Sequence, residues 1–211
     1  MSKLKRLVFD LDGCFFSFNN GYARLLYEEN PDKIPKDWQE SDTTPSIWDW
    51  DRARGFTSEE LARVWGRITK KDSTFWSKLE PLPGAVETVK RLNQLTRKDV
   101  EVLFLSNRFG YNTKRQSEIA LYELGMNYPT VLIAPSGEAK IPTLRALGAD
   151  YFLDDRLDTL NEAVTVAASA GYNWKIHLHL LNKPYNQTGR LGGYTVVDSL
   201  QDSLERVELW S

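Results

Sequence analysis

Residues 7–13 read Leu-Val-Phe-Asp-Leu-Asp-Gly, and the rest of the chain is best understood from this segment outward. The three apolar residues are typical of a buried strand that ends at Asp10. Asp12 and Gly13 follow, so two carboxylates lie two positions apart at the carboxyl end of this strand. A plain turn, with both carboxylates capping backbone amides, is the alternative interpretation.

The same pattern of an apolar run ending in polar residues recurs along the chain. Further strands are expected at 100–105, 130–134, 151–153, 174–181 and 194–197. Helical patterns cover 84–95, 113–124, 137–147, 158–170 and 199–207. Gly125 and Gly148 lie just beyond two of these helices, as C-terminal stops do. The alternation predicts an α/β fold with a Rossmann-like parallel sheet and helices on both faces.

Polar residues follow three of the expected strands directly. Asp10, Ser106 and Asp154 each fall at a carboxyl end. In open parallel sheets, ligands bind outside the carboxyl ends of the strands, at a switch in strand order. The sequence therefore predicts that these three side chains meet at one site.

Residues 17–79 interrupt the alternation. Helices are expected at 21–29, 57–70 and 73–79. Five of the seven tryptophans lie in this segment, namely Trp38, Trp48, Trp50, Trp65 and Trp76. We interpret it as a small helical cap inserted after the first strand, with 1–16 and 80–211 forming the catalytic core. The segment Pro81–Gly84 marks the return to the core.

Composition excludes several classes of protein. The 211 residues suit one core with a small insert, and the formal charge is only -2. Lysine and arginine form no basic run, so nucleic acid is not an expected partner. No stretch approaches the ~18 apolar residues of a membrane span, so a membrane is not an expected partner either. The single cysteine, Cys14, allows no internal disulfide, and the expected location is cytoplasmic.

Four motifs occur in a fixed order along the chain: Asp10-x-Asp12-Gly13, Ser106 after an apolar strand, Lys140 at the start of a helix, and Asp154-Asp155 after another strand. In these four motifs and their order, the sequence resembles the haloacid dehalogenase superfamily of phosphohydrolases. The resemblance implies a Rossmann-like core, a bound Mg²⁺ and an aspartyl-phosphate intermediate.

The first motif supplies the two catalytic carboxylates. A carboxylate can accept a phosphoryl group, and Asp10 is expected to attack phosphorus in line. Asp12 can turn toward the leaving group, protonate it, and later take a proton from the hydrolytic water. Family members without an acid at this position tend to perform other chemistry, so Asp12 favours a phosphatase over a dehalogenase.

A cation is needed between the anionic nucleophile and the anionic phosphate. Mg²⁺ prefers oxygen ligands in octahedral geometry, and one or two carboxylates usually hold it. Asp10 and Asp154 are expected to supply these carboxylates, and Asp155 is expected to hold a metal-bound water. The resemblance adds the backbone carbonyl of Asp12 as a ligand.

The phosphoryl oxygens need hydrogen-bond donors and a positive charge. Ser106 and the backbone amide of Asn107 are the expected donors. The resemblance implies that Lys140 is the cation, because the family's lysine lies at the start of the helix before the Asp154 strand; Lys114 is the alternative. Arg108 follows the Ser106 loop and is a candidate contact to the substrate.

Residues 75–93 resemble the cap-to-core return of the 5'(3')-deoxyribonucleotidases, and 176–182 are similar too. The substrate implied is a small phosphate monoester, namely a nucleoside monophosphate. In that family, aromatic residues of the cap stack on the base, and such stacking contributes about 1–3 kcal/mol per base. The candidates here are Phe18, Trp48, Trp50, Trp65, Phe75 and Trp76. Alternatively, these rings form only the small core of the cap.

Other interpretations remain open at this stage. A phosphatase for sugar phosphates or nucleic-acid ends is one rival, and a non-catalytic binding protein of the same fold is another. A homodimer is compatible with the sequence. His177 and His179 are expected to pack rather than to bind a metal. Cys14 is expected to be a small residue near the cleft rather than a nucleophile, and 189–193 is expected to form a turn rather than a phosphate cradle.

Overall fold

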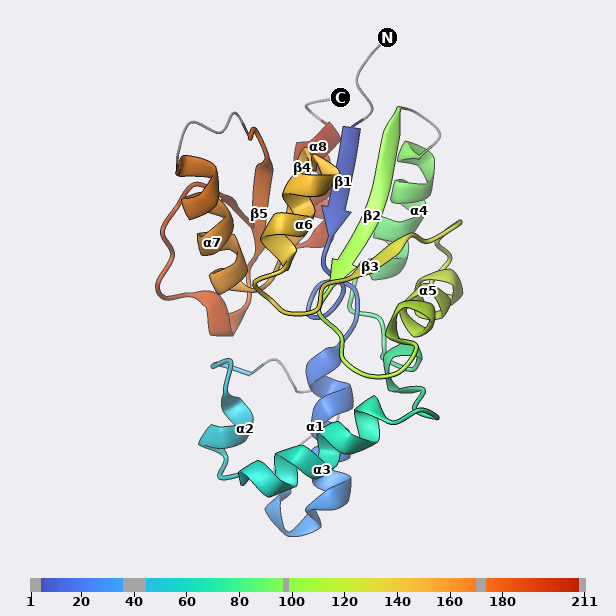
Figure 1. Cartoon of the computed structure of the whole chain (residues 1–211), viewed down its shortest axis with the longest axis vertical. Helices are drawn as coiled ribbons and strands as arrows, with labels where there is room; N and C mark the ends of the chain where they lie inside the picture. Colours follow the sequence, from blue (N-terminus) through green and yellow to red (C-terminus); the bar gives the residue numbers. More distant parts are fainter. Residues whose placement is uncertain (1–4, 36–44, 97–98, 170–173, 209–211) are drawn as a thin grey trace.

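The computed structural model describes residues 5–35, 45–96, 99–169 and 174–208 (Figure 1). Trp38, one of the five tryptophans noted above, lies outside these ranges. None of the helices in the described ranges has both the length and the apolar character required to cross a membrane.

The core is a parallel sheet of six strands in the order β3-β2-β1-β4-β5-β6. The strands are β1 (Lys5–Phe9), β2 (Val100–Ser106), β3 (Val131–Ile133), β4 (Tyr151–Asp154), β5 (His177–Leu181) and β6 (Thr195–Val197). All six expected strands are present, although the fifth begins at His177 rather than at residue 174. The α/β prediction is therefore confirmed.

Helices cover both faces of the sheet, as the continuous apolar strands require. They are α4 (Ala85–Leu95), α5 (Thr113–Glu123), α6 (Lys140–Leu147), α7 (Leu157–Ala168) and α8 (Leu200–Glu208). Side chains of α6 and α7 pack with one face of the sheet, and those of α4, α5 and α8 contribute to the core on the other. Gly125 and Gly148 have positive φ after α5 and α6, as expected of helix stops.

The first strand lies in the middle of the sheet. Phe9 is in register with Phe104 of β2 on one side and with Leu153 of β4 on the other. The chain runs from β1 outward to β2 and β3, then returns to place β4 against the free side of β1. This reversal is the switch point at which ligands bind in such sheets. Asp10 and Asp154 lie on its two sides.

The inserted helices lie beyond the carboxyl edge of the sheet (Figure 1). They are α1 (Phe18–Glu29), the short 3-10 helix η1 (Pro31–Lys33), α2 (Trp50–Ala53), α3 (Ser58–Thr69) and the 3-10 helix η2 (Phe75–Ser77). A capping box begins α3, in which Thr57 and Glu60 exchange side-chain to backbone hydrogen bonds.

Two local features differ from the sequence prediction. The expected helix at 73–79 is only one 3-10 turn, because Ser73 accepts a hydrogen bond from the Phe75 amide and Ser77 donates one to the Thr74 carbonyl. Such side-chain bonds compete with continued helix formation. The short helix α2 was not expected, and it begins at Trp50.

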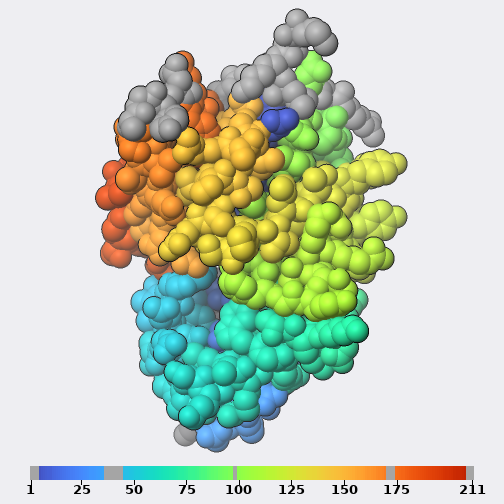
Figure 2. All heavy atoms as spheres, viewed as in Figure 1, coloured from blue at the N-terminus to red at the C-terminus, as the bar shows by residue number. Residues whose placement is uncertain are grey.

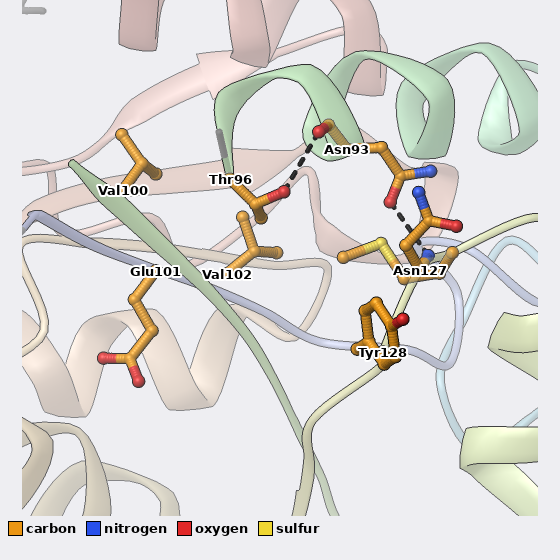
Figure 3. Close-up of a pocket in the computed structure, with 8 residues that line it drawn as sticks. Asn93, Thr96, Val100, Glu101, Val102, Asn127 and Tyr128 are labelled. Carbon is orange, nitrogen blue, oxygen red and sulfur yellow. Dashed lines mark hydrogen bonds between the residues drawn. The ribbon is translucent and has the colours of Figure 1, made fainter. Parts of the chain in front are cut away.

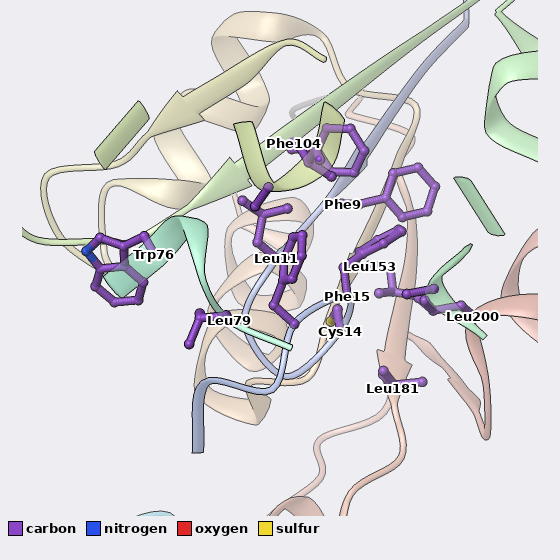
Figure 4. Close-up of a cluster of buried hydrophobic side chains, with 14 of the residues drawn as sticks. Phe9, Leu11, Cys14, Phe15, Trp76, Leu79, Phe104, Leu153, Leu181 and Leu200 are labelled. Carbon is purple, nitrogen blue, oxygen red and sulfur yellow. The ribbon is translucent and has the colours of Figure 1, made fainter. Parts of the chain in front are cut away.

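Aromatic packing holds the loop after β1 in place. Phe15 is fully buried between Phe9 and Phe104, with ring centroids 5.9 and 5.5 Å away and the planes nearly perpendicular. Figure 4 shows these rings beside Leu11 and Cys14 of the same loop. The bulky residues after the first motif are therefore core residues that fix the Asp10–Gly13 turn.

Candidate active site

Two of the cavities in the molecule differ sharply in chemistry. One, of about 540 Å³, is lined by Asn93, Thr96, Val100, Glu101, Val102, Met126, Asn127 and Tyr128 (Figure 3). The charged side chain among these residues is Glu101, which is neutralised by Arg6 at 2.6 Å. This arrangement offers nothing that could activate a substrate.

The other cavity lies between the carboxyl edge of the sheet and the inserted helices, where the space-filling view shows a hollow (Figure 2). Its volume is about 170 Å³, and its lining residues are Asp10, Asp12, Phe18, Trp48, Trp65, Trp76, Ser106, Asn107, Phe109, Lys140, Asp155 and Arg156. Buried charge on one wall and aromatic rings on the other make this the candidate active site.

Lys140 joins the two sides of the switch point. Its ammonium lies 2.9 Å from Asp10 Oδ1 and 2.9 Å from Asp154 Oδ2, and all three side chains are almost completely buried. Burial alone would lower the pKa of Lys140, but the two carboxylates raise it above the ordinary value. The lysine is therefore a permanent cation at the base of the cavity. Lys114, the alternative, is exposed and pairs with Glu118.

The two acids after β4 have different roles in the structure. Asp154 uses both of its carboxylate oxygens, because Oδ2 accepts from Lys140 and Oδ1 accepts from the Arg156 amide at 2.8 Å. Asp155 instead keeps Oδ1 buried with no hydrogen-bond partner among the described residues. Asp155, rather than Asp154, therefore has a free carboxylate oxygen, and it is Asp155 that lies with Asp10 in a group that could hold a cation. The sequence prediction had Asp154 as the carboxylate ligand and Asp155 at a metal-bound water.

Residues beyond β5 hold Asp155 in place, and the sequence analysis missed them. The Tyr185 hydroxyl donates a hydrogen bond to Asp155 Oδ2. Asn186 Nδ2 donates to the Asp155 carbonyl at 2.8 Å and to the Leu181 carbonyl at 2.8 Å. Neither residue belongs to a motif with a strand-end pattern, so only the fold brings them to the site.

The acidic cluster is short of positive charge. Burial raises the pKa of Asp10 well above its ordinary value; Lys140 opposes the rise, whereas Asp154, Asp155 and Asp12 add to it. Burial likewise raises the pKa of Asp155 to about 7, with Asp154 as the next contributor. Carboxylates that repel one another in a dry site are stabilised by an added cation.

The donor set of this cluster suits a hard divalent cation. One ligand atom from each of Asp10, Cys14 and Asp155 lies within 4.8 Å of the others. Burial raises the pKa of the Cys14 thiol well above its ordinary value, so this residue remains a neutral thiol and the oxygens are the usable ligands. Two carboxylates with room for water and a phosphate oxygen match the preference of Mg²⁺.

Asp12 also lines the cavity. Ser106 Oγ donates to Asp12 Oδ2 at 3.2 Å, which places the two motifs in direct contact. Arg108 donates to both carboxylate oxygens of Asp12, from Nε at 2.9 Å and from Nη2 at 2.7 Å. Asn107 lines the cavity, and its Nδ2 donates to the Ala134 carbonyl at 3.2 Å.

The aromatic candidates divide into two groups. Phe18, Trp48, Trp65 and Trp76 line the cavity, together with Phe109, which the sequence analysis missed. The Phe18 ring stacks on Trp76 at 5.7 Å. Trp50 and Phe75 are not among the lining residues and pack against the buried core.

The two histidines of β5 lie in different environments. His179 is buried, with Nδ1 2.8 Å from Ser203 Oγ and its ring edge-on to Tyr151 at 4.9 Å. Burial lowers the pKa of His179 to about 4. His177 is exposed at the start of the strand. The packing expectation is therefore confirmed for His179.

Comparison with solved structures defines the class of fold. The chain matches a haloacid dehalogenase-like hydrolase from Burkholderia xenovorans over 99% of both chains, with a TM-score of 0.58 and 16% identity. It matches a predicted phosphoglycolate phosphatase from Haemophilus somnus over 98% of this chain and 99% of that one, with a TM-score of 0.55 and 15% identity. The chain thus has the fold of the haloacid dehalogenase-like hydrolases.

Sequence comparison gives more specific relatives. The mitochondrial 5'(3')-deoxyribonucleotidase of Mus musculus is 30% identical over 105 residues, which cover 47% of this chain and 43% of that protein. The human protein of the same name is 32% identical over 101 residues, which cover 45% of this chain and 40% of that protein. The similarity thus spans less than half the length of these relatives. No protein-family model matches the chain.

Proposed function

We propose that this protein is an Mg²⁺-dependent phosphomonoesterase in which Asp10 is the nucleophile. The observation that carries the proposal is the buried ion pair of Lys140 with Asp10 and Asp154 at the switch point of the sheet. Such an arrangement fixes a carboxylate beside a permanent cation, where the charge of a phosphoryl group would be compensated. Residues 17–79 act as the cap, and 1–16 with 80–211 act as the core.

The proposed reaction has two displacements at phosphorus. In the first, an oxygen of Asp10 bonds to phosphorus while the ester bond breaks, and the leaving alkoxide takes a proton from Asp12. In the second, water gives a proton to Asp12, attacks phosphorus, and breaks the bond to Asp10, which releases inorganic phosphate. Ser106 Oγ and the Asn107 amide donate hydrogen bonds to the phosphoryl oxygens throughout.

The proposed metal ligands are the carboxylates of Asp10 and Asp155 and the carbonyl of Asp12. Asp154 belongs to the same acidic group, but it acts by holding Lys140. When bound, Mg²⁺ would neutralise the phosphate and the nucleophile so that the two anions can approach each other.

The proposed substrate is a (deoxy)nucleoside 5'-monophosphate. Supporting this are the partial similarity to 5'(3')-deoxyribonucleotidases and the aromatic wall of Phe18, Trp65 and Trp76 opposite the charged residues. The cavity of about 170 Å³ is smaller than the ~300–1,000 Å³ of most ligand pockets, so the cap must open to admit a nucleotide. The proposed setting is nucleotide metabolism in the cytoplasm, whose reducing conditions suit the buried thiol of Cys14.

A phosphatase for a small phosphate ester is the second candidate. The small volume of the cavity favours it, and one structural neighbour is named as a predicted phosphoglycolate phosphatase. Phosphate release from nucleoside 5'- and 3'-monophosphates, sugar phosphates and phosphoglycolate, each with Mg²⁺ and with EDTA, separates the two. Turnover that persists in EDTA contradicts the metal assignment, and preference for a non-nucleotide ester contradicts the nucleotidase assignment alone.

A further inference from the structure

Arg108 does not belong to the wall of the cavity, although it follows the phosphate-binding loop directly. Its side chain is 0% exposed, whereas the Asp12 side chain that it contacts is 19% exposed. Asp12 lines the cavity and Arg108 lies behind it. A substrate in the cavity would therefore meet Asp12 but not Arg108.

Each of the three guanidinium nitrogens of Arg108 donates a hydrogen bond. Nε and Nη2 donate to the two oxygens of Asp12 at 2.9 and 2.7 Å, and Nη1 donates to Ser117 Oγ at 2.8 Å. Ser117 in turn donates to the Thr113 carbonyl at 2.7 Å, within α5. The arginine thus ties the carboxylate of Asp12 to a helix of the core.

Aromatic rings flank the same guanidinium. Its central carbon lies 5.5 Å from the centroid of Phe16 and 5.0 Å from that of Trp76. Trp76 is fixed from both ends, because its ring nitrogen donates to the Phe109 carbonyl at 2.9 Å and its amide donates to Gln116 Oε1 at 3.1 Å. Two cation–π contacts and three hydrogen bonds leave the Arg108 guanidinium little freedom to move.

We propose that Arg108 is a positioning residue that holds the carboxylate of Asp12 in the orientation required for proton transfer. This inference rests on the proposed phosphatase function. A free aspartate rotates about its terminal bond, whereas a carboxylate with both oxygens bound by one planar guanidinium has a single plane. A displacement of about 1 Å at a proton donor can lower the rate by about 100-fold.

The positioning role has two rivals that predict different measurements. If Arg108 contacted the phosphate, its removal would weaken phosphate binding. If Arg108 only stabilised the fold, its removal would lower activity equally toward all substrates or not at all. A residue that acts through Asp12 affects the departure of a poor leaving group most, because a good leaving group needs little protonation.

The first experiment compares Arg108→Met and Arg108→Lys with the wild type on two substrates. For a nucleoside monophosphate, whose alkoxide leaving group needs a proton, we expect kcat of Arg108→Met to fall about 100-fold with KM within threefold. Because the second displacement also uses Asp12 and is common to both esters, 4-nitrophenyl phosphate is followed by its single-turnover release of 4-nitrophenol, which reports the first displacement alone and should fall less than about tenfold. Arg108→Lys should recover part of the loss, and Arg63→Met, at an exposed arginine of α3, should change kcat less than twofold.

The second experiment is a double-mutant cycle with Asp12→Asn on 4-nitrophenyl phosphate. If Arg108 acts through Asp12, adding Arg108→Met to Asp12→Asn should change kcat by less than about twofold, because the partner is already lost. Inorganic phosphate binding, measured by calorimetry, should stay within threefold of the wild type in Arg108→Met.

Three results would overturn the inference: equal losses on both substrates, additive losses in the cycle, or phosphate binding weakened more than tenfold. Should Arg108→Met fail to fold, Arg108→Lys tests the same substrate contrast. Hydrolysis of 4-nitrophenyl phosphate by the wild type reports on the proposed function separately. A wild-type protein that releases no phosphate from any ester would refute the proposed function, but it would not contradict the contacts between Arg108 and Asp12.

Discussion

The carboxylate of Asp155 occupies the space that a side chain on Gly13 would need. A Cβ atom built on Gly13 would overlap Asp155 Oδ2, and the glycine has a φ of +75°. The first motif therefore ends in glycine for two reasons, the backbone conformation and the approach of a proposed metal ligand. The two acidic motifs interlock at this position.

Gly13→Ala should abolish most activity, because the new methyl group displaces Asp155 from the proposed metal site. We expect a loss of at least about 100-fold in kcat/KM, together with about 1–3 kcal/mol of destabilisation. Gly55→Ala is the matched control, since Gly55 has a φ of +80° but no atom within 4 Å of the added Cβ. Comparable activity losses in the two variants would show that backbone strain, not the clash, is responsible.

Lys140→Met should leave two buried carboxylates without their cation. Breaking a buried ion pair on one side costs about 3–5 kcal/mol, and chemical denaturation should show a loss of this order. The double variant Lys140→Met/Asp154→Asn removes one of the stranded charges and should recover part of the stability. Both proteins should remain inactive. A double variant no more stable than the single one would argue against the ion pair.

In the metal-free protein, the contribution of Asp155 to stability should fall as the pH rises from about 4 to about 7. The pKa of Asp155 is raised to about 7 in the folded state, so the native protein keeps a proton that the unfolded chain has already lost. Mg²⁺ should therefore raise the Tm more at pH 7.5 than at pH 5. Asp155→Asn should flatten the pH dependence of stability and remove most of the rise in Tm caused by Mg²⁺. An unchanged rise in Tm would show that the metal does not bind at this residue.

His179 should have the opposite influence on stability. Its pKa is lowered to about 4 by burial, so the unfolded chain takes up a proton first as the pH falls below about 6.5. The contribution of His179 to stability should decrease as the pH falls between these two values, by about 3 kcal/mol in total. His179→Gln should remove this decrease, whereas His177→Gln, at an exposed position, should keep it.

Trp48 is expected to act in substrate binding rather than in chemistry. Its ring lies 4.2 Å from the Arg156 guanidinium and 5.5 Å from the Tyr185 ring, so it connects the inserted segment to the core at the edge of the cavity. Trp48→Ala should raise KM for a nucleotide about tenfold, in line with a loss of 1–3 kcal/mol, while kcat changes less than threefold. An unchanged KM would assign this ring to packing alone.

Much of the fold and of the acidic centre could be predicted from the sequence. Apolar strands that end in polar residues identified β1, β2 and β4, and with them Asp10, Ser106 and Asp154. Parallel strands bring their carboxyl ends to one edge, so a one-dimensional pattern is enough to indicate the site.

The residues that the sequence did not reveal depend on contacts between distant segments. Tyr185 and Asn186 lie in the turn after β5 and reach Asp155 only because β5 pairs with β4. Asp154 and Asp155 differ in whether their carboxylate pairs with Lys140, and this pairing depends on side-chain geometry that the sequence does not show. The burial of Arg108 likewise follows from its flanking rings, which come from separate parts of the chain.

Trp76 contacts both the aromatic wall of the cavity and the arginine that binds Asp12. One face of the indole belongs to the aromatic wall beside Phe18, and the ring also contacts the guanidinium that binds Asp12. Exchanging the inserted helices for those of another protein, in order to change the substrate, would therefore disturb proton transfer unless the graft stops short of this tryptophan. The useful junction for such chimaeras lies before residue 74, which leaves the return segment native.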